Sequence, residues 1–510
     1  MSARAVTPTS APRHGSRAAS AGDRRRRASG LARRVPRAAW ICGLIACLNA
    51  ICWSLVTPAF QVPDEPSHFA YVKQLAETGE LPTSSSQVTS SEESAALTAL
   101  HQVAVRQRPQ NQAIATNAEQ RQLESALAAA PHETGSPAAG VATSQPPLYY
   151  ALEAIPYTVA RGSTVLDRLA LMRLASSLFA GLSAVFVFLF LREALPRAPW
   201  AWTVGGLSVA LAPLLGFMSG AVNPDAMLFA ASASLFYCLA RAFRRGLSAR
   251  RAAAIGAVSA IGLLTKLNFA GLLPGIALAL ALLTLRAARA HGASTALRWL
   301  AFALALGAVP LLAYAGVEAL SHESLLRGAS VSSGSPGSSP LAELDYIWQL
   351  YLPRLPGTAD YFPGLFTTRQ LWFDGYVGLY GWLDTVFPSW VYDVALIPAG
   401  AIALLCARAL VQARAALRSR AGELLVYATL AAGLMALVGA ASFTAFPQID
   451  AEYAQARYLL PLLPLLGAVL ALAARGAGRR WGPSAGALIV VLFLAHDLFS
   501  QLLVVARYYG

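Results

Sequence analysis

The stretch TPAFQVPDEPSHFAY, residues 57–71, directly follows the first hydrophobic segment of the chain. It carries two adjacent carboxylates, Asp64 and Glu65, between two prolines, Pro63 and Pro66. Charged side chains at the mouth of a membrane helix are costly, and flanking prolines restrict the directions in which they point. We therefore expect the rest of the chain to be a membrane scaffold that presents this loop, with an active site at the outer membrane surface.

The composition assigns the chain to the polytopic membrane proteins. Of 510 residues, 56% are hydrophobic and only 13% are charged, which is more apolar surface than a soluble domain needs. The net charge is +14, and residues 1–38, with ten arginines against one acid, contribute +9 of it. We interpret residues 1–38 as a disordered basic cytoplasmic tail beside anionic lipid. Nucleic acid is therefore not an expected partner.

Eleven hydrophobic segments approach the length of about 20 residues that a transmembrane helix needs. The first lacks a small-residue cleavage site, which favours a retained anchor over a cleaved signal peptide. The chain is thus expected to be an all-α polytopic membrane protein with about 11 transmembrane helices and large outer loops. The expected spans are residues 39–56, 170–191, 199–219, 225–242, 252–265, 268–285, 299–317, 388–407, 423–441, 458–474 and 484–503.

Basic residues alternate between successive connections, and this pattern predicts the orientation. One set of short connections holds 17 arginines, whereas the short connections of the other set hold only Lys266 and Arg457. Because cytoplasmic loops are enriched in Lys and Arg, we expect a multi-pass plasma-membrane protein with a cytoplasmic N-terminus. The arginines are Arg192, Arg197, Arg241, Arg244, Arg245, Arg250, Arg251, Arg286, Arg289, Arg298, Arg408, Arg414, Arg418, Arg420, Arg475, Arg479 and Arg480.

The spans and loops divide the chain into modules. We expect an N-terminal transmembrane module at 39–317, which includes an outer catalytic loop at 57–169. An outer aromatic-rich loop at 318–387 and a C-terminal transmembrane module at 388–510 follow. The aromatic residues of the outer loop suit either sugar binding by stacking or an interfacial belt.

The catalytic loop contains a Ser- and Ala-rich part at 84–140, in which 91–106 and 117–129 are candidates for short helices. The half-apolar stretch at 145–160 is too short to span the bilayer, and we expect it to lie at the interface.

Acids and bases from separate parts of the chain are expected to meet at the outer membrane level. Asp64 or Glu65 suits a general base, and Lys266, Arg457 and Arg173 suit the phosphate of a lipid-linked donor. Each residue also has a structural interpretation. Residues 223–225, Asn-Pro-Asp, suit a turn and helix cap, Lys266 and Arg457 suit interfacial anchors, and His68 suits a local hydrogen bond better than a metal.

The chain lacks the signatures of enzymes that use soluble nucleotide donors or a hydrolytic serine or zinc. No Walker sequence and no GxGxxG motif after a strand pattern occur, and GxSxG and HExxH are also missing. These absences favour a donor that is dissolved in the membrane.

Four motifs together resemble a known group of enzymes. They are PDEPSHF (63–69), QPPLYY (145–150), SGAVNPD (219–225) and RYLLP (457–461). An acidic pair after the first span of a protein with about 11 spans resembles the GT-C superfamily of glycosyltransferases. The four motifs in this order resemble, over roughly residues 40–475, a bacterial multi-pass family catalogued only as a domain of unknown function.

The resemblance implies an inverting transfer of a sugar from a polyprenyl-phosphate donor to a cell-envelope glycan or glycolipid, with Asp64 or Glu65 as base. We favour Asp64 as base, with Glu65 orienting it or binding a metal, although the reverse assignment stays open. Some relatives use a divalent metal such as Mg²⁺ or Mn²⁺ and others do not; here Asp64 and Glu65 would hold it. The substrate-binding residues implied by the motifs are His68, Tyr71, Gln145, Tyr149, Asn223, Asp225 and Tyr458.

Two other functions are alternatives: a transporter or flippase of a lipid-linked envelope precursor, and a non-catalytic envelope assembly protein. A transporter predicts charges along a path through the membrane. The expected spans contain few charges beyond His496-Asp497, and the two halves show no repeat, which argues against transport. An assembly protein would tolerate loss of the acidic pair.

Overall fold

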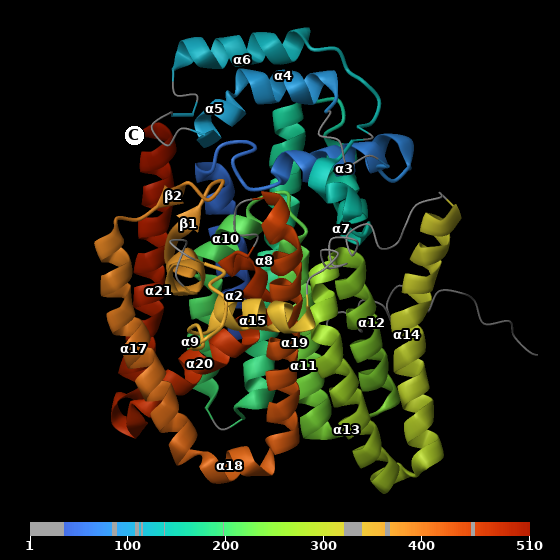
Figure 1. The fold of residues 1–510 in the computed structure, drawn as a ribbon, viewed down its shortest axis with the longest axis vertical. Helices are drawn as coiled ribbons and strands as arrows, with labels where there is room; N and C mark the ends of the chain where they lie inside the picture. Colours follow the sequence, from blue (N-terminus) through green and yellow to red (C-terminus); the bar gives the residue numbers. More distant parts are fainter. Residues whose placement is uncertain are drawn as a thin grey trace, which may run out of the picture.

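The computed structural model describes residues 35–83, 89–107, 112–113, 116–136, 138–196, 198–320, 339–362, 368–449 and 454–510. Most of the predicted basic tail therefore lies outside the described residues. The described chain is almost entirely helical and contains one two-stranded hairpin (Figure 1). The expectation of an all-α polytopic membrane protein is confirmed. The division into modules at 39–317, 318–387 and 388–510 stays a prediction.

Long helices form the bundle, and the shorter elements lie at its ends or pack against it. The long helices are α2 (Arg37–Val56), α8 (Val165–Ala194), α9 (Pro199–Ala210), α11 (Asp225–Arg245), α12 (Ala249–Thr265), α13 (Leu273–His291), α14 (Ala293–Leu320), α17 (Ser389–Gln412), α19 (Ala421–Ile449), α20 (Leu463–Gly476) and α21 (Gly478–Tyr509). The shorter elements are α3 (Glu65–Thr78), α4 (Ser91–Ala99), α5 (Gln102–Gln107), α6 (Asn117–Ala129), η1 (Gly140–Ser144), α7 (Leu148–Val159), α10 (Pro213–Ser219), η2 (Leu267–Leu272), α15 (Pro340–Tyr351), η4 (Gln370–Asp374), α16 (Gly375–Gly378), β1 (Leu379–Tyr380), β2 (Thr385–Val386), α18 (Arg414–Ser419) and η5 (Ala456–Leu462).

Nine described helical segments are long and apolar enough to cross a membrane, and the bent pair α9–α10 makes a tenth. The span expected at 199–219 is bent rather than continuous, because α9 and α10 meet at 54°. Pro213 begins α10 and cannot donate the backbone hydrogen bond that would continue α9. The segment expected at 252–265 forms α12, whose 17 residues fall short of a straight crossing. The α12 segment therefore accounts for the difference between these ten described spans and the expected eleven.

Small residues let the first helices of the bundle approach closely. Helix α8 packs between α2 and α11, and a side chain added at Gly181 would lie 2.9 Å from the carbonyl oxygen of Gly43 in α2. Glycine at this contact therefore lets the backbones of α2 and α8 come together, as in many membrane helix pairs.

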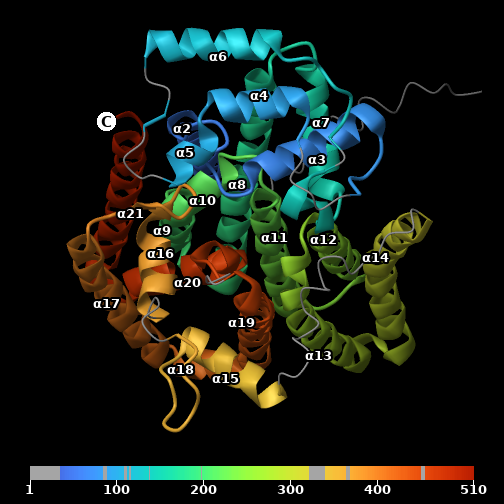
Figure 2. The same ribbon diagram turned by 45° about the horizontal axis from the view of Figure 1, so that its top comes forward.

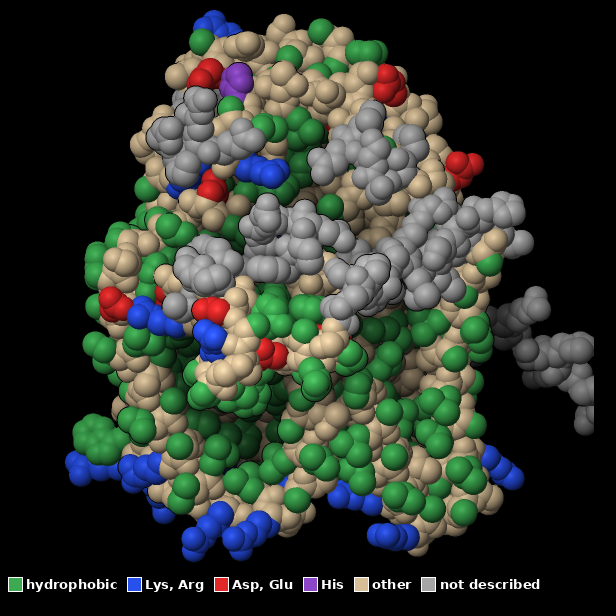
Figure 3. All heavy atoms as spheres, viewed as in Figure 1, with side chains coloured by type: hydrophobic (Ala, Val, Ile, Leu, Met, Phe, Trp, Pro, Cys, Tyr) green, Lys and Arg blue, Asp and Glu red, His purple; other side chains and the backbone are tan. Residues whose placement is uncertain are grey.

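The two ends of the bundle differ in charge. Helices α3 to α7 cover one end, which we call the loop end (Figure 2). The α13–α14 and α20–α21 connections and α18 lie at the opposite end, which we call the arginine end (Figure 1). Figure 3 shows Lys and Arg side chains gathered along the arginine end. The alternating connections predicted from the sequence therefore do segregate in space.

Part of the aromatic-rich loop packs into the bundle. Strands β1 and β2 pair antiparallel, with Leu379 opposite Val386. The fully buried Tyr380 contacts Trp53 of α2 and Phe217 of α10, with ring centroids 4.9 and 5.4 Å apart. The hairpin is thus attached to the helices next to the acidic loop.

The polar residues His496 and Asp497 of α21 have separate partners. Asp497 accepts hydrogen bonds from Trp53 Nε1 and Asn49 Nδ2 of α2, at 2.9 and 3.2 Å. His496 Nε2 hydrogen-bonds the carbonyl of Val377. Asp497 therefore joins α21 to α2 within the bundle, as expected for a polar group between membrane helices.

Candidate functional site

The acidic loop leaves α2 and turns into α3 at Asp64. The Asp64 backbone is left-handed, with φ 67°, and its carbonyl accepts the His68 N–H, which starts the helix. Aspartate is among the few non-glycine residues that adopt this conformation regularly. Because Glu65 is already helical, the two neighbouring carboxylates point to different surroundings.

Glu65 is fully buried and its carboxylate is saturated with donors. Arg173 of α8 binds both oxygens, with Nε to Oε1 at 2.7 Å and Nη2 to Oε2 at 2.6 Å. The backbone N–H groups of Phe60 and Val222 donate to the same two oxygens, at 3.0 and 3.1 Å. Such a buried, bidentate pair fixes geometry. It ties the acidic loop to α8 and to the turn before α11.

Arg173 has no donor left for a substrate phosphate. Besides Glu65, its guanidinium donates to the carbonyl oxygens of Ser54, Thr57 and Pro58, at 2.9–3.1 Å. A guanidinium has five N–H groups, and these contacts use all of them. Arg173, which was predicted as a phosphate ligand, therefore differs from Lys266 and Arg457, which remain available for that role.

Asp64 forms a partly exposed ion pair with Arg457 of η5. Arg457 Nη2 lies 3.0 Å from Asp64 Oδ2, and the two side chains are 6% and 30% exposed, respectively. Nε and Nη1 of Arg457 have no partner among the described residues. An unpaired buried donor is costly unless something binds it. Arg457 therefore offers two open donor nitrogens beside the acid.

A second ion pair lies next to the first. Lys266 Nζ donates to Asp225 Oδ1 at 2.7 Å, and Asp225 Oδ2 has no partner within the described chain. The Asn223 side chain accepts from the Asp225 N–H and donates to the carbonyl of Pro63, at 3.0 and 3.4 Å. The turn at 223–225 therefore holds the second pair against the acidic loop.

Burial and neighbouring charges together set the ionisation of Asp64 and His68. Burial acts to raise the pKa of Asp64, but Arg457 and Lys266 help to outweigh it and hold that pKa below its usual value. Burial lowers the pKa of His68 to about 3, despite the opposing effect of Asp64. At neutral pH a carboxylate thus lies beside an uncharged imidazole.

An aromatic layer lies behind His68. Its Nδ1 hydrogen-bonds the Tyr150 hydroxyl at 2.9 Å, and Tyr71 stacks on Tyr150 with centroids 3.7 Å apart. The Tyr71 hydroxyl donates to the backbone carbonyl of Gln145, while Tyr149 hydrogen-bonds Ser176. Tyr71 and Tyr149 are fully buried. Of the predicted substrate-binding residues, Tyr71, Gln145 and Tyr149 therefore belong to this layer behind His68.

Tyr458 lies on the side of the cations. Its ring is 5.2 Å from the guanidinium carbon of Arg457 and 5.8 Å from Lys266 Nζ. The structure thus brings together residues from four separate segments of the chain: Asp64, His68, Asn223, Asp225, Lys266, Arg457 and Tyr458.

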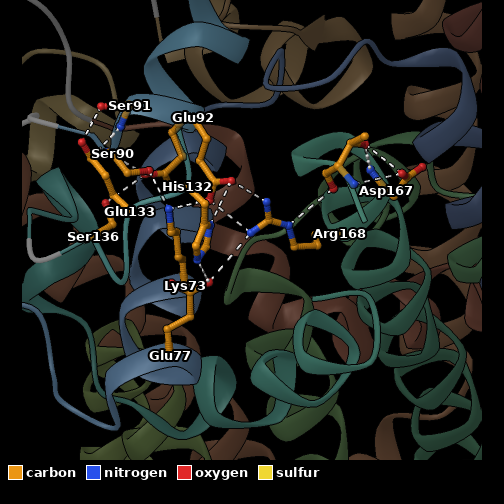
Figure 4. Close-up of polar contacts among 12 residues, drawn as sticks. Lys73, Glu77, Ser90, Ser91, Glu92, His132, Glu133, Ser136, Asp167 and Arg168 are labelled. Atoms are coloured by element: carbon orange, nitrogen blue, oxygen red, sulfur yellow. Dashed lines mark hydrogen bonds and ion pairs between the residues drawn. The ribbon is translucent and has the colours of Figure 1, made fainter. Parts of the chain in front are cut away.

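A buried charge network that the sequence analysis missed supports the site from the loop end (Figure 4). Lys73 of α3 and Arg168 of α8 both bind Glu92 of α4, Arg168 in a bidentate manner at 2.7 and 3.2 Å. Burial acts to raise the pKa of Glu92, but the two cations lower it to about 2. The one available signal was Lys73, a charge inside the apolar run 69–75.

Glu65 does not fit the predicted role of a metal ligand, because both of its oxygens already accept two N–H groups each. Among the described residues, no three side chains of His, Cys, Asp or Glu are placed so that they could hold a metal ion together. Dependence on a divalent metal stays a prediction.

Comparison with known proteins gives one family match. The family model described as "Predicted membrane protein (DUF2142)" matches residues 47–466, which is most of the chain. No curated protein matches the chain. A crystal structure of the Archaeoglobus fulgidus oligosaccharyltransferase in the apo form is similar, with a TM-score of 0.42 and 12% identity. That similarity covers 92% of this chain and 56% of the archaeal one, so the present chain spans little more than half of its length.

Proposed function

We infer the function of this chain, which belongs to the DUF2142 family of predicted membrane proteins, from the charges around Asp64. We propose that it is an inverting glycosyltransferase of the plasma membrane. In this proposal it moves a sugar from a polyprenyl-phosphate donor to a cell-envelope acceptor at the outer face. The observation that carries the proposal is an ionised, partly exposed carboxylate paired with a buried guanidinium that keeps two donor nitrogens open.

In the proposed reaction Asp64 is the general base. Its carboxylate takes the proton of an acceptor hydroxyl, whose oxygen forms a bond to the anomeric carbon of the donor sugar. The bond between that carbon and the phosphate oxygen breaks, and the phosphate keeps the electron pair. Because attack and departure occur on opposite faces of the sugar, the anomeric configuration inverts.

The phosphate is the leaving group, so the enzyme needs to stabilise negative charge more than to supply a proton. The open Nε and Nη1 atoms of Arg457 can each donate a charge-assisted hydrogen bond to a phosphate oxygen. Lys266 adds a second positive charge close by, held by Asp225. We assign the donor phosphate to Arg457 and Lys266, and we assign positioning roles to Glu65 and Arg173.

The test is Asp64→Asn in membrane vesicles that contain the full chain and a polyprenyl-phosphate sugar. We expect transfer to fall by roughly 10²–10⁴-fold, the usual contribution of a general base. Asp360→Asn is the matched control, because Asp360 is an exposed acid paired with Arg354. Both variants should insert as the wild type does. Wild-type transfer rates in Asp64→Asn would overturn the assignment of the base.

The donor is identified by lipid and glycan profiling of a deletion strain, in which the unused donor should accumulate and the acceptor should lack one sugar. The same vesicles also distinguish sugar transfer from the alternative function, transport of the lipid-linked sugar. Movement of the lipid-linked sugar across the bilayer without transfer of its sugar would replace the glycosyltransferase proposal with a flippase.

A further inference from the structure

Three arginines meet at the turn between α11 and α12, and we call them the arginine cluster. Arg241 and Arg245 belong to the last two turns of α11, and Arg251 belongs to the first turn of α12. Arg245 donates to Glu193 near the end of α8 at 2.8 Å, and α18 is attached to the same end of α8 through Arg420. The arginine cluster therefore lies at the arginine end of the bundle, opposite the acidic loop.

Two buried nitrogen atoms of the arginine cluster have no acceptor. The Nε atoms of Arg241 and Arg251 are buried without a partner among the described residues. Arg241 uses its Nη1 atom instead, which donates to the Tyr237 hydroxyl at 2.7 Å. A buried N–H group without an acceptor costs free energy, and solvent does not reach these two atoms. A bound acceptor from outside the described chain would satisfy both of them.

The acid that lies closest to the arginine cluster in the described structure is already bound. Glu193 accepts from Arg244 and Arg245, at 2.9 and 2.8 Å, and the first turn of α12 contains no acid. Burial and the positive charges of Arg241 and Arg245 lower the pKa of Arg251, which precedes the apolar part of α12. The cluster thus carries an excess of positive charge that an anion would neutralise.

The start of α12 favours the same kind of ligand. Ser248 precedes the helix but makes no side-chain cap hydrogen bond, so the first N–H groups of α12 lack a side-chain acceptor. Arg250 and Arg251 add positive charge at this terminus, which is the unfavourable sign for the start of a helix. An anion between the arginine cluster and α12 would reverse this sign and accept from the N–H groups.

The position of the arginine cluster favours a lipid headgroup over a soluble anion. Tyr237 lies one turn before Arg241 and is partly exposed, and its ring packs against Phe186 of α8 with centroids 6.1 Å apart. Tyrosine near the end of a membrane helix is typical of the interface. Arg241 therefore lies at the level of the headgroups, where basic pockets between helices bind anionic lipid.

We propose that the arginine cluster and the start of α12 bind the phosphate of an anionic phospholipid in the leaflet at the arginine end. The phosphate oxygens accept from the Nε atoms of Arg241 and Arg251, and the acyl chains lie along the bundle beside Tyr237. This lipid joins α11 to α12 and stabilises the folded state. The proposal goes beyond sugar transfer and does not depend on it, because the cluster and the acidic loop lie at opposite ends.

The test measures binding of three probes to the purified, delipidated full chain in detergent: dioleoyl phosphatidate, dioleoyl phosphatidylcholine and inorganic phosphate. Arg251→Gln removes one member of the arginine cluster. Arg479→Gln is the matched control, because it removes the same charge from an exposed position at the same end. We expect Arg251→Gln to weaken phosphatidate binding at least about tenfold, the usual effect of losing a charge-assisted hydrogen bond. Arg479→Gln should bind phosphatidate as the wild type does.

The melting temperature separates lipid binding from a structural role of Arg251. Without lipid, Arg251→Gln should melt at the wild-type temperature or above it, because it removes an unpaired buried donor and the repulsion by Arg241 and Arg245. Phosphatidate should raise the melting temperature of the wild type and of Arg479→Gln, and it should raise that of Arg251→Gln less. A lower melting temperature of lipid-free Arg251→Gln would overturn the proposal, since Arg251 would then have a structural partner.

The probes decide between the possible occupants. Equal weakening of phosphatidate binding by Arg251→Gln and Arg479→Gln overturns the site, because binding is then a general attraction to basic residues. Inorganic phosphate that binds as tightly as phosphatidate, with the same sensitivity to Arg251→Gln, supports an anion site and overturns the lipid as its occupant. Phosphatidylcholine that binds as tightly as phosphatidate overturns the requirement for an anionic lipid.

Discussion

Two adjacent acids in one loop have different environments because a helix begins between them. Asp64 precedes the first turn of α3 in a left-handed conformation and keeps part of its carboxylate exposed, whereas Glu65 is helical and fully buried. This contrast depends on one backbone dihedral. The residue types and their spacing contain no information about it, so the sequence analysis favoured Asp64 as base but left the reverse assignment open.

The two acids should give opposite phenotypes when each is replaced by its amide. In Glu65→Gln the buried Arg173 keeps its charge without a carboxylate, which costs on the order of 3–5 kcal/mol of folding free energy. We expect a clear drop in melting temperature, measured by tryptophan fluorescence in detergent, and little change for Asp64→Asn. A Glu65→Gln protein that melts like the wild type but transfers no sugar would exchange the two roles.

The pH dependence of transfer follows from the same residues. Asp64 has a pKa below its ordinary 3.8, so its basic form persists as the pH falls from 8 to 5. Burial puts the pKa of His68 at about 3, so the imidazole does not titrate in this range. We expect kcat/KM to stay flat from pH 8 to 5, and His68→Gln to keep that flat profile. A loss of half the rate near pH 6 would contradict this.

Arg173 shows what a sequence pattern cannot resolve at this scale. It was grouped with Lys266 and Arg457 because all three lie at the same predicted membrane level. The structure gives Arg173 five hydrogen bonds to Glu65 and to backbone carbonyls, whereas Arg457 retains two open nitrogens. This difference depends on contacts with carbonyl oxygens of residues that are distant in the sequence, so the residues next to Arg173 do not indicate it.

Among the elements, short helices with capping signals were predictable and breaks in long helices were not. Helix α6 spans Asn117–Ala129, as expected, and it begins with a capping box of Thr116 and Glu119. Helices α4 and α5 divide the candidate at 91–106. The break between α9 and α10 was missed, because a continuous apolar segment is interpreted as one span even when a proline bends the helix.

Helix α7 is attached to α8 through a buried acid. Ser176 Oγ donates to Glu153 Oε1 at 2.8 Å, and Glu153 Oε2 has no partner among the described residues. Burial raises the pKa of Glu153 from 4.5 to about 8. Since the folded state holds the proton more tightly than the unfolded state, its contribution to stability is complete below pH 4.5. That contribution is lost as the pH rises to about 8.

Glu153→Gln should therefore stabilise the protein only at high pH. The amide cannot ionise, so the variant avoids a penalty on the order of 5 kcal/mol, since the pKa rises from 4.5 to about 8 and each pKa unit corresponds to about 1.4 kcal/mol. We expect its melting temperature to exceed that of the wild type at pH 8.5 and to match it at pH 5. The exposed Glu124→Gln is the control. An equal difference at both pH values would show that ionisation is not the cause.

At the scale of the whole molecule, charge alone predicted which connections share an end. The alternation of arginine-bearing connections carries this information because successive spans cross in opposite directions. Figure 3 shows the resulting arginine end, and the pairs Asp64–Arg457 and Asp225–Lys266 lie among residues from the opposite set of connections. Convergence of the two pairs was predictable in outline. Their exact pairing depended on how the turn at 223–225 docks on the acidic loop.

The predicted orientation places the loop end outside the cell and the arginine end in the cytoplasm. Two matched variants test it, Ser125→Cys in α6 and Ser419→Cys in α18, both at exposed positions of opposite ends. The five native cysteines, which lie within helices of the bundle, serve as the background. In intact cells a membrane-impermeant thiol reagent should label Ser125→Cys, and it should reach Ser419→Cys only after permeabilisation. Labelling in the reverse order would put Asp64 on the cytoplasmic side, where the proposed envelope acceptor is absent.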